Sequence, residues 1–338
     1  MQASLNSARP AHRFFYRVAH QTIRVDALDL TAADAIRKIF AEWYLAPLTA
    51  EKVEEPAAAI RIRSGVAPPA IPADCRQFEI ADDGVCHTNG DASYIEIQSS
   101  VLAVGAPGLA DVEIWLNASP DEDFPVLIRV ISHALSSALR RCGLFELHSA
   151  AVVEPASGGG VLIIGPSGSG KSTLAVQLSA EGWPYLSDDV LLLGRSQDFI
   201  EAWALRRCFA VTPETFGASE FLQARVKSMP NDYREKDRFS PHDVFVSEFK
   251  ESCRPRTLLF CQVTGKGQSS VTPLVPSETM ARLIRMSPWS CYDQSTARRH
   301  LEVFSSLVRQ SQGYALFAGR DLLAPGNSSQ FLADTLRN

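Results

Sequence analysis

The chain has 338 residues, of which 46% are hydrophobic and 21% charged, and its formal net charge at pH 7 is −5. This balance is typical of a globular protein with one large or two ordinary domains. No basic surplus exists to neutralise phosphates, so the composition argues against a general nucleic-acid binder and against binding to anionic membranes.

Targeting and redox features point to the cytoplasm. No apolar run approaches the roughly 20 residues that a membrane-spanning helix needs, and residues 1–13 lack the apolar core of a signal peptide. The seven cysteines form an odd, widely spaced set without a C-x-x-C pair. Neither a disulfide framework nor a zinc site is therefore expected, and we expect a reduced, cytoplasmic protein without a membrane or nucleic-acid partner.

The first part of the chain carries mixed helix and strand signals. Residues 14–28 have alternating apolar positions that predict a strand, and residues 32–43 place apolar side chains at helical spacing. Short alternating segments predict three further strands at residues 59–63, 94–98 and 112–116. We expect a smaller mixed α/β domain over residues 1–120, which would help to shape an acceptor site, and a second domain over residues 121–338.

A stronger helical pattern opens the second part of the chain. The acidic residues 121–123 and Pro125 suit a helix start, and Gly143 marks its end. Residues 145–153 and 161–164 are apolar and strand-like, and only a short turn separates them. A hairpin is therefore expected to deliver the chain to the segment that follows.

That segment, residues 165–172, matches the pattern G-x-x-x-x-G-K-[ST] and lies between a predicted strand and a predicted helix. This order is the context that a phosphate-binding loop needs. Backbone N–H groups of such a loop turn inward around a polyphosphate, and the helix N-terminus adds a partial positive charge. Lys171 would reach the β- and γ-phosphates, and the Ser172 hydroxyl would ligate Mg²⁺. We expect ATP to contact Gly165, Ser167, Gly168, Ser169, Gly170, Lys171, Ser172 and Thr173.

An aspartate pair, Asp188-Asp189, follows Lys171 by only 17 residues, at the end of the predicted short strand 184–187. A helix followed directly by a strand predicts a parallel strand beside the first, returned by a right-handed crossover. Both aspartates would then emerge at the edge of the sheet that carries the loop. One carboxylate could hold Mg²⁺, and the other could accept the proton of an attacking hydroxyl. The alternative is a solvated turn. Apolar residues 190–194 follow, so the pair is expected inside a long β-segment.

Three segments together resemble the HPr kinase/phosphorylase family, whose nucleotide core also resembles phosphoenolpyruvate carboxykinase. They are residues 147–153, 159–172 and 185–190. The resemblance implies an α/β fold with a P-loop nucleotide-binding core of that type. It also implies ATP and Mg²⁺ as cofactors and a homo-oligomeric assembly. The implied reaction is transfer of the γ-phosphate to a hydroxyl, with a serine of a protein or peptide as the first expectation.

The resemblance implies roles for individual residues as well. In that family a strand histidine lies near the transferred phosphate, and an aspartate pair provides the base and metal contacts. By match, His148 assists at the transferred phosphate, Asp188 is the catalytic base, and Asp189 binds Mg²⁺ together with Ser172. Lys171 is expected to act in catalysis too. Outside such a constellation, a strand histidine is more often a satisfied core residue.

Some features differ from that family. Thr173 follows Ser172 where the bacterial regulatory enzyme usually has glutamate, and no convincing copy of its second signature lies downstream. The N-terminal half also differs from the family's usual N-terminal domain. The chain is therefore expected to be a divergent relative rather than the regulator of sugar transport. Such relatives include kinases of free serine and kinases that modify ribosomally made peptides.

A cationic group is still required, because phosphoryl transfer spreads negative charge over the equatorial oxygens. The polar, charged segment 233–241 is the best candidate, with Arg238 or Lys236 as the clamp, although such a loop is usually only solvated. Arg206 and Arg207 are alternatives. Two other functions stay open: a small-metabolite kinase, for example of free serine, and a nucleotide-gated binding module with little turnover.

Overall fold

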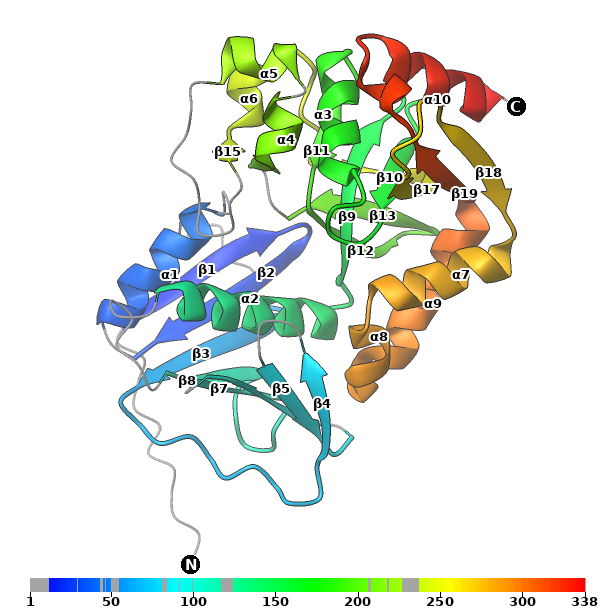
Figure 1. Cartoon of the computed structure of the whole chain (residues 1–338). Helices are drawn as coiled ribbons and strands as arrows, with labels where there is room; N and C mark the ends of the chain where they lie inside the picture. Colours follow the sequence, from blue (N-terminus) through cyan, green and yellow to red (C-terminus); the bar gives the residue numbers. More distant parts are fainter. Residues whose placement is uncertain are drawn as a thin grey trace, which may run out of the picture. The chain divides into compact units, whose positions relative to one another are not determined.

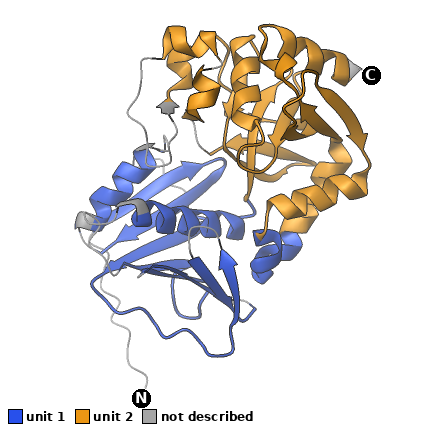
Figure 2. Cartoon of the chain, viewed as in Figure 1, with its two compact units in different colours: residues 1–144, 289–299 blue, residues 145–288, 300–338 orange. Residues whose placement is uncertain are grey.

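The chain folds into two compact units, Met1–Leu144 with Trp289–Arg299 and Phe145–Pro288 with His300–Asn338 (Figure 2). The computed structural model describes residues 12–28, 30–42, 45, 47–49, 55–80, 84–90, 92–98, 100–116, 124–205, 208–217, 219–226 and 237–337. Among these residues, no helix has both the length and the apolar content needed to cross a lipid bilayer.

The first unit contains an eight-stranded mixed sheet in the order β1-β2-β3-β8-β7-β6-β5-β4 (Figure 1). Its strands are β1 His12–Val18, β2 Gln21–Ala27, β3 Ala58–Ser64, β4 Arg76–Ile80, β5 Gly84–Thr88, β6 Ser93–Ile97, β7 Ser100–Val104 and β8 Val112–Leu116. The strands predicted at 59–63, 94–98 and 112–116 are confirmed as β3, β6 and β8. The strand predicted within residues 14–28 is present, but this stretch holds two strands, because a tight turn with Ala19 at φ 52° folds it into the β1–β2 hairpin.

Two long helices belong to this unit, α1 Leu30–Glu42 and α2 Phe124–Arg141. The helix predicted at 32–43 is confirmed as α1, whose buried face includes Ile36, Ile39 and Phe40. The predicted helix before Gly143 is confirmed as α2, while residues 121–123 lie outside the described part of the chain. Since α2 packs on β3, β7 and β8, it joins the first unit, and the boundary lies at residue 144 rather than at 120.

A buried ion pair holds the returning segment Trp289–Arg299 to α2. This segment contains α8 Trp289–Tyr292 and the start of α9 Gln294–Gln310. Arg140 Nε donates to Asp293 Oδ2 at 3.0 Å, and the guanidinium lies 4.5 Å from the centroid of a Trp289 ring. Burial alone would raise the pKa of the Asp293 carboxyl, but the charge of Arg140 and hydrogen bonds from Ser295, Arg140 and Thr296 lower it below the ordinary value.

The second unit is built on a sheet in the order β16-β13-β12-β9-β10-β17-β19-β18, with β11 also paired to β9. Its strands are β9 Phe145–Val153, β10 Gly160–Ile164, β11 Tyr185–Ser187, β12 Val190–Ser196, β13 Phe199–Ala204, β16 Ser252–Cys253, β17 Pro255–Val263, β18 Ser270–Leu274 and β19 Gln312–Ala318. β10, β17 and β19 are parallel, and the predicted β9–β10 hairpin is confirmed. With two mixed sheets and flanking helices, the chain is an α/β protein, as predicted.

Helices cover both faces of this second sheet (Figure 1). They are α3 Lys171–Ala180 and α10 Asn327–Arg337 on one face, and α7 Pro276–Met286 with the later part of α9 on the other. Along β10, Val161 and Ile163 pack toward α3, whereas Leu162 and Ile164 pack toward α7. This two-sided burial explains why β10 is an unbroken apolar run.

Smaller elements follow β13 and β19. They are β14 Phe209–Val211, α4 Pro213–Gly217, α5 Glu220–Arg225, β15 Asp237–Phe239, α6 Pro241–Val244 and the 3-10 helix η2 Arg320–Leu323. β14 and β15 form a separate two-stranded sheet, in which Ala210 is opposite Arg238. Their aromatic side chains Phe209 and Phe239 pack into the core on the α3 side of the main sheet.

Candidate functional site

The 165–170 loop joins the carboxyl end of β10 to α3, in the predicted order of strand, loop and helix. Gly170 is the N-cap of α3 with φ 94°, in the left-handed region that favours glycine. At Gly165 a Cβ atom would lie 2.5 Å from Ser169 Oγ and 2.7 Å from the carbonyl oxygen of Cys261. The loop therefore closes too tightly at its start for a larger residue.

Lys171 lies folded back over the first half of this loop. Its side chain is buried, and its Nζ donates to the carbonyl oxygens of Gly165 at 2.8 Å and Pro166 at 2.9 Å. In phosphate-binding loops this lysine contacts the β- and γ-phosphates. The terminal phosphates of a bound nucleotide would consequently lie at the 165–166 end of the loop.

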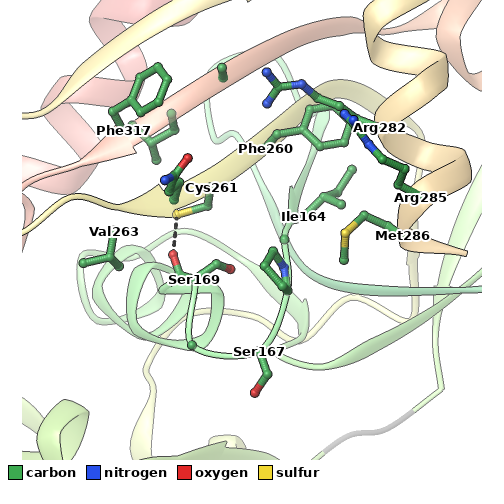
Figure 3. A pocket seen from close by; sticks show the side chains of 16 residues that line it. Ile164, Ser167, Ser169, Phe260, Cys261, Val263, Arg282, Arg285, Met286 and Phe317 are labelled. Atoms are coloured by element: carbon green, nitrogen blue, oxygen red, sulfur yellow. Dashed lines mark hydrogen bonds between the residues drawn. The ribbon is translucent and has the colours of Figure 1, made fainter. Parts of the chain in front are cut away.

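A cysteine of β17 contacts the end of the loop. Cys261 Sγ donates to the carbonyl oxygen of Ser169 at 3.1 Å (Figure 3). Burial raises the pKa of the Cys261 thiol to about 12, although the nearby Lys171 ammonium opposes this. The thiol is therefore protonated at neutral pH and is available as a donor to the loop.

Strand β9 lies between the loop-bearing strand β10 and the strands β11 and β12 that flank the aspartate pair. This strand pairs with β10 along one edge and with β11 and β12 along the other, in each case antiparallel. β11 therefore runs parallel to β10, but β9 lies between them. The predicted direct pairing of these two parallel strands is wrong, because the β9–β10 hairpin already occupies that edge of β10.

Asp188 and Asp189 lie in a bend between β11 and β12, not inside a continuous strand as predicted. The Ser149 N–H donates to the carbonyl oxygen of Asp189 at 2.9 Å, and Ser149 is opposite Ile164, the last residue of β10. Ser172 Oγ also donates to the carbonyl oxygen of Asp188 at 3.4 Å. The structure thus brings the aspartate pair to the end of the sheet at which β10 runs into the loop.

The two aspartates have different surroundings. Asp188 is only 1% exposed, and its Oδ2 accepts a hydrogen bond from the Ala210 N–H at 3.0 Å. The Asp189 side chain is 24% exposed, and its Oδ1 lies 3.0 Å from His148 Nδ1. His148 is itself 40% exposed, so it is not a core histidine. A solvent-facing His148–Asp189 pair therefore stands beside a buried Asp188.

The remaining predicted site residues lie at the tip of the loop, in α3 and on β15. Ser167 and Gly168 form the exposed tip of the loop, and Thr173 Oγ1 lies 2.8 Å from Thr215 Oγ1 of α4. Only the backbone of Arg238 is described; it pairs with Ala210, the residue that donates to Asp188. The alternative cations Lys236, Arg206 and Arg207 lie outside the described residues.

Two cavities flank the loop. The arginine cavity, of about 390 Å³, lies between residues 165–169, β17, β19 and α7, and includes Arg282 and Arg285 (Figure 3). The threonine cavity, of about 370 Å³, is lined by Gly170, Thr173 and Thr215 with residues around η2. If a bound nucleotide placed its terminal phosphates near Lys171 at the start of the loop, its nucleoside would extend toward the threonine cavity.

Sequence reasoning missed Arg282, Arg285 and Thr215. The two arginines are three residues apart on an amphipathic helix, a spacing that also describes an ordinary solvated face. Thr215 lies in a short helix with no motif. Only the fold, which brings β19 and α7 beside the loop, reveals that these side chains border it.

The donors near the loop suit Mg²⁺. In the part of the chain that the structure describes, no group of three or more His, Cys, Asp or Glu could hold a metal by itself. Mg²⁺ in phosphoryl-transfer sites usually needs only one or two carboxylates, because phosphates and water supply the other oxygens. The Ser172 hydroxyl and the carboxylates of Asp188 and Asp189 have this chemistry.

Comparisons with known proteins leave the family open. No protein-family model matches the chain, and no curated protein matches it. Among solved structures, the Hpr(Ser) kinase/phosphatase from Coxiella burnetii is similar over 57% of this chain and 88% of that chain, with 12% identity and a TM-score of 0.32. A likeness at this TM-score is too weak to assign the chain to that family, so its function has to be inferred from its own residues.

Proposed function

We propose that the chain is an ATP- and Mg²⁺-dependent kinase that transfers the γ-phosphate to a hydroxyl, that of a serine in a protein or peptide. One observation carries the proposal. A glycine loop with a buried lysine and a solvent-facing His148–Asp189 pair meet at one edge of the same sheet. The first feature suits polyphosphate binding, and the second suits activation of an incoming hydroxyl.

In this proposal the solvent exposure of each side chain decides whether it binds phosphate, holds the metal or accepts a proton. Loop N–H groups and Lys171 bind the terminal phosphates. Ser172 and the buried Asp188, which are linked by the hydrogen bond from Ser172 Oγ to the Asp188 carbonyl oxygen, would hold Mg²⁺, and the bound metal would neutralise charge on the phosphates. Asp189, oriented by His148, accepts the proton of the acceptor hydroxyl. This exchanges the roles that the sequence predicts for the two aspartates, because only Asp189 is open to an incoming molecule.

Rate enhancement would come mainly from positioning. A phosphoryl group in transfer needs in-line placement of the hydroxyl and cations around its equatorial oxygens, with little covalent chemistry from the protein. Lys171 supplies one such cation. Arg238 remains a second candidate for such a cation. Its backbone is paired with Ala210 of the neighbouring strand, and the Ala210 N–H donates to the Asp188 carboxylate.

The proposal is tested by following where the labelled γ-phosphate of ATP is transferred. Purified protein with Mg²⁺ is mixed with size-fractionated extract of its host, and the Lys171→Ala protein serves as control after its fold is checked by circular dichroism. Label in the protein or peptide fraction that depends on Lys171 supports the proposal, and mass spectrometry then identifies the residue. Undiminished transfer by Lys171→Ala would overturn the site assignment.

The same experiment separates the two alternatives. Label only in small molecules would identify a metabolite kinase, with free serine tested first. No transfer to either fraction, together with Mg²⁺-dependent ATP binding, would identify a nucleotide-gated binding module.

A further inference from the structure

The arginine cavity combines a polar loop, an apolar wall and two cations (Figure 3). The start of the 165–170 loop forms one side, and α7 contributes Arg282 and Arg285. Phe260 and Phe317 line it between these sides, and Phe317 is 37% exposed, unusually open for a large apolar side chain. None of the described residues that line the cavity is acidic, so its charged side chains are all positive.

The two arginines differ in how they are held. Arg282 donates to Glu278 Oε1 at 2.7 Å, and its guanidinium lies 5.6 Å from the centroid of the Phe260 ring. This pins Arg282 at the cavity wall, while its Nε is buried without a hydrogen-bond partner among the described residues. Arg285 is exposed and lies one turn further along α7. The carboxylate of Glu278 balances only one of the two arginine charges, so the cavity keeps a net positive charge.

The loop side offers a further polar group. Ser169 lines the cavity and is only 6% exposed, and its buried Oγ has no hydrogen-bond partner in the described part of the chain. A buried hydroxyl without a partner is costly and is usually satisfied by a ligand or water. A cavity with such a hydroxyl, two arginines and aromatic walls is suited to an anionic group carried on an apolar body.

The end of α7 connects this cavity to the His148–Asp189 pair. Ser287 Oγ donates to the carbonyl oxygen of Glu146 at 3.4 Å, and Glu146 lies on β9 two residues before His148. The cavity and the pair therefore border the same edge of the sheet, at the end of the loop where the terminal phosphates would lie.

We propose that the arginine cavity binds the acceptor through a carboxylate or phosphate carried on an apolar body, with Arg282 and Arg285 as its cationic partners. That the occupant is the acceptor rests on the proposed kinase function. The preference for an organic anion does not, since it follows from the cavity's own residues. The two parts of the proposal are therefore tested separately.

The anion preference is tested with 8-anilinonaphthalene-1-sulfonate, an aromatic anion, and N-phenyl-1-naphthylamine, its uncharged counterpart. Fluorescence titrations compare the wild type with Arg285→Met and Arg282→Met/Arg285→Met. The anion should bind Arg285→Met about tenfold more weakly, the loss expected for one charge-assisted hydrogen bond. Binding of the uncharged probe should not change.

Arg309→Met is the matched control, because Arg309 is exposed on α9 and does not line the cavity. Its affinity for the anion should equal that of the wild type. Circular dichroism checks that each variant folds, and Arg285→Met alone decides the question if the double variant unfolds. Equal affinity of Arg285→Met and wild type for the anion, or no binding by the wild type, overturns the proposal.

Two further arms separate this proposal from the proposed function. Lys171→Ala should bind the anion as the wild type does, even if it no longer binds nucleotide. MgATP should not displace the probe; displacement would make the cavity part of the nucleotide site and defeat the proposal. Competition by hexanoate or by an acetylated acidic serine peptide then identifies the source of the anion as a small molecule or a peptide.

Discussion

Neighbouring aspartates at positions 188 and 189 illustrate how strongly burial separates two identical side chains. Asp188 accepts a backbone hydrogen bond inside the protein, while Asp189 meets solvent beside His148. The sequence predicts that the pair stands near the loop. It does not predict which member faces outward, because that depends on the bend between β11 and β12.

Replacing each aspartate by asparagine should separate their roles. Asp189→Asn should lose phosphoryl transfer by at least about 100-fold, the usual contribution of a general base, while ATP still binds with Mg²⁺. Asp188→Asn should instead weaken Mg²⁺-dependent ATP binding. Labelled-ATP transfer and nucleotide titrations with and without Mg²⁺ measure the two effects. The reverse pattern would return the base to Asp188, as the sequence predicts.

Gly165→Ala should damage the loop itself. The added methyl group would meet Ser169 Oγ and the carbonyl oxygen of Cys261, so the loop must shift, at a cost of about 1–3 kcal/mol typical of overpacking. We expect weaker ATP binding and a lower midpoint of unfolding in urea. Gly267→Ala is the control, because a Cβ there meets no atom within 4 Å. Equal ATP affinity in both variants would contradict a tightly closed loop.

Strand β9 is the element that organises the candidate site. Its apolar pattern and short turn to β10 identify the hairpin from sequence alone. The pairing of its other edge with both β11 and β12 could not be predicted, because strand order depends on long-range contacts rather than local periodicity. For the same reason the arginines of α7 could not be assigned to the loop before the fold was known.

The Arg140–Asp293 pair should make the attachment of α8 and α9 to α2 dependent on pH. Both side chains are nearly fully buried, so Asp293→Asn leaves an uncompensated charge and should cost about 3 kcal/mol or more. The lowered folded-state pKa of Asp293 means that its stabilisation is present above the unfolded-state pKa of about 3.9 and is lost as pH falls through the folded-state pKa.

Urea unfolding of wild type and Asp293→Asn measures this effect. The difference in unfolding free energy should be largest near pH 7 and should narrow below about pH 4. A difference that stays constant down to pH 3 would show that packing, and not the charge, accounts for the loss.

At the scale of the whole molecule, the chain does not divide into two consecutive segments. The sequence predicts two domains with a boundary at residue 120, and the composition gives no sign that Trp289–Arg299 returns to the first unit. Local sequence patterns cannot predict such a return, because it depends on contacts between residues that are far apart in the sequence. It becomes visible only through contacts such as Arg140 with Asp293 and Phe78 with Tyr292.

Residues 1–144 alone should therefore fold poorly. The fragment lacks the carboxylate partner of Arg140, and it loses the stacking of Tyr292 on Phe78 at 5.0 Å between ring centroids. We expect a broad, low-temperature thermal transition by circular dichroism. Adding a peptide of residues 288–300 should raise and sharpen it, whereas a peptide with Asp293→Asn should not. A cooperative transition without the peptide would contradict this view.

The Cys261 thiol that hydrogen bonds to the glycine loop should resist chemical damage. Thiolates, rather than thiols, are the forms that oxidants and alkylating agents attack. With a pKa of about 12 and 4% exposure, Cys261 is almost never in that form at neutral pH, whereas Cys291 is exposed. Peroxide or iodoacetamide should therefore modify Cys291 long before Cys261. The hydrogen bond from Cys261 to the loop is in this way shielded from oxidation.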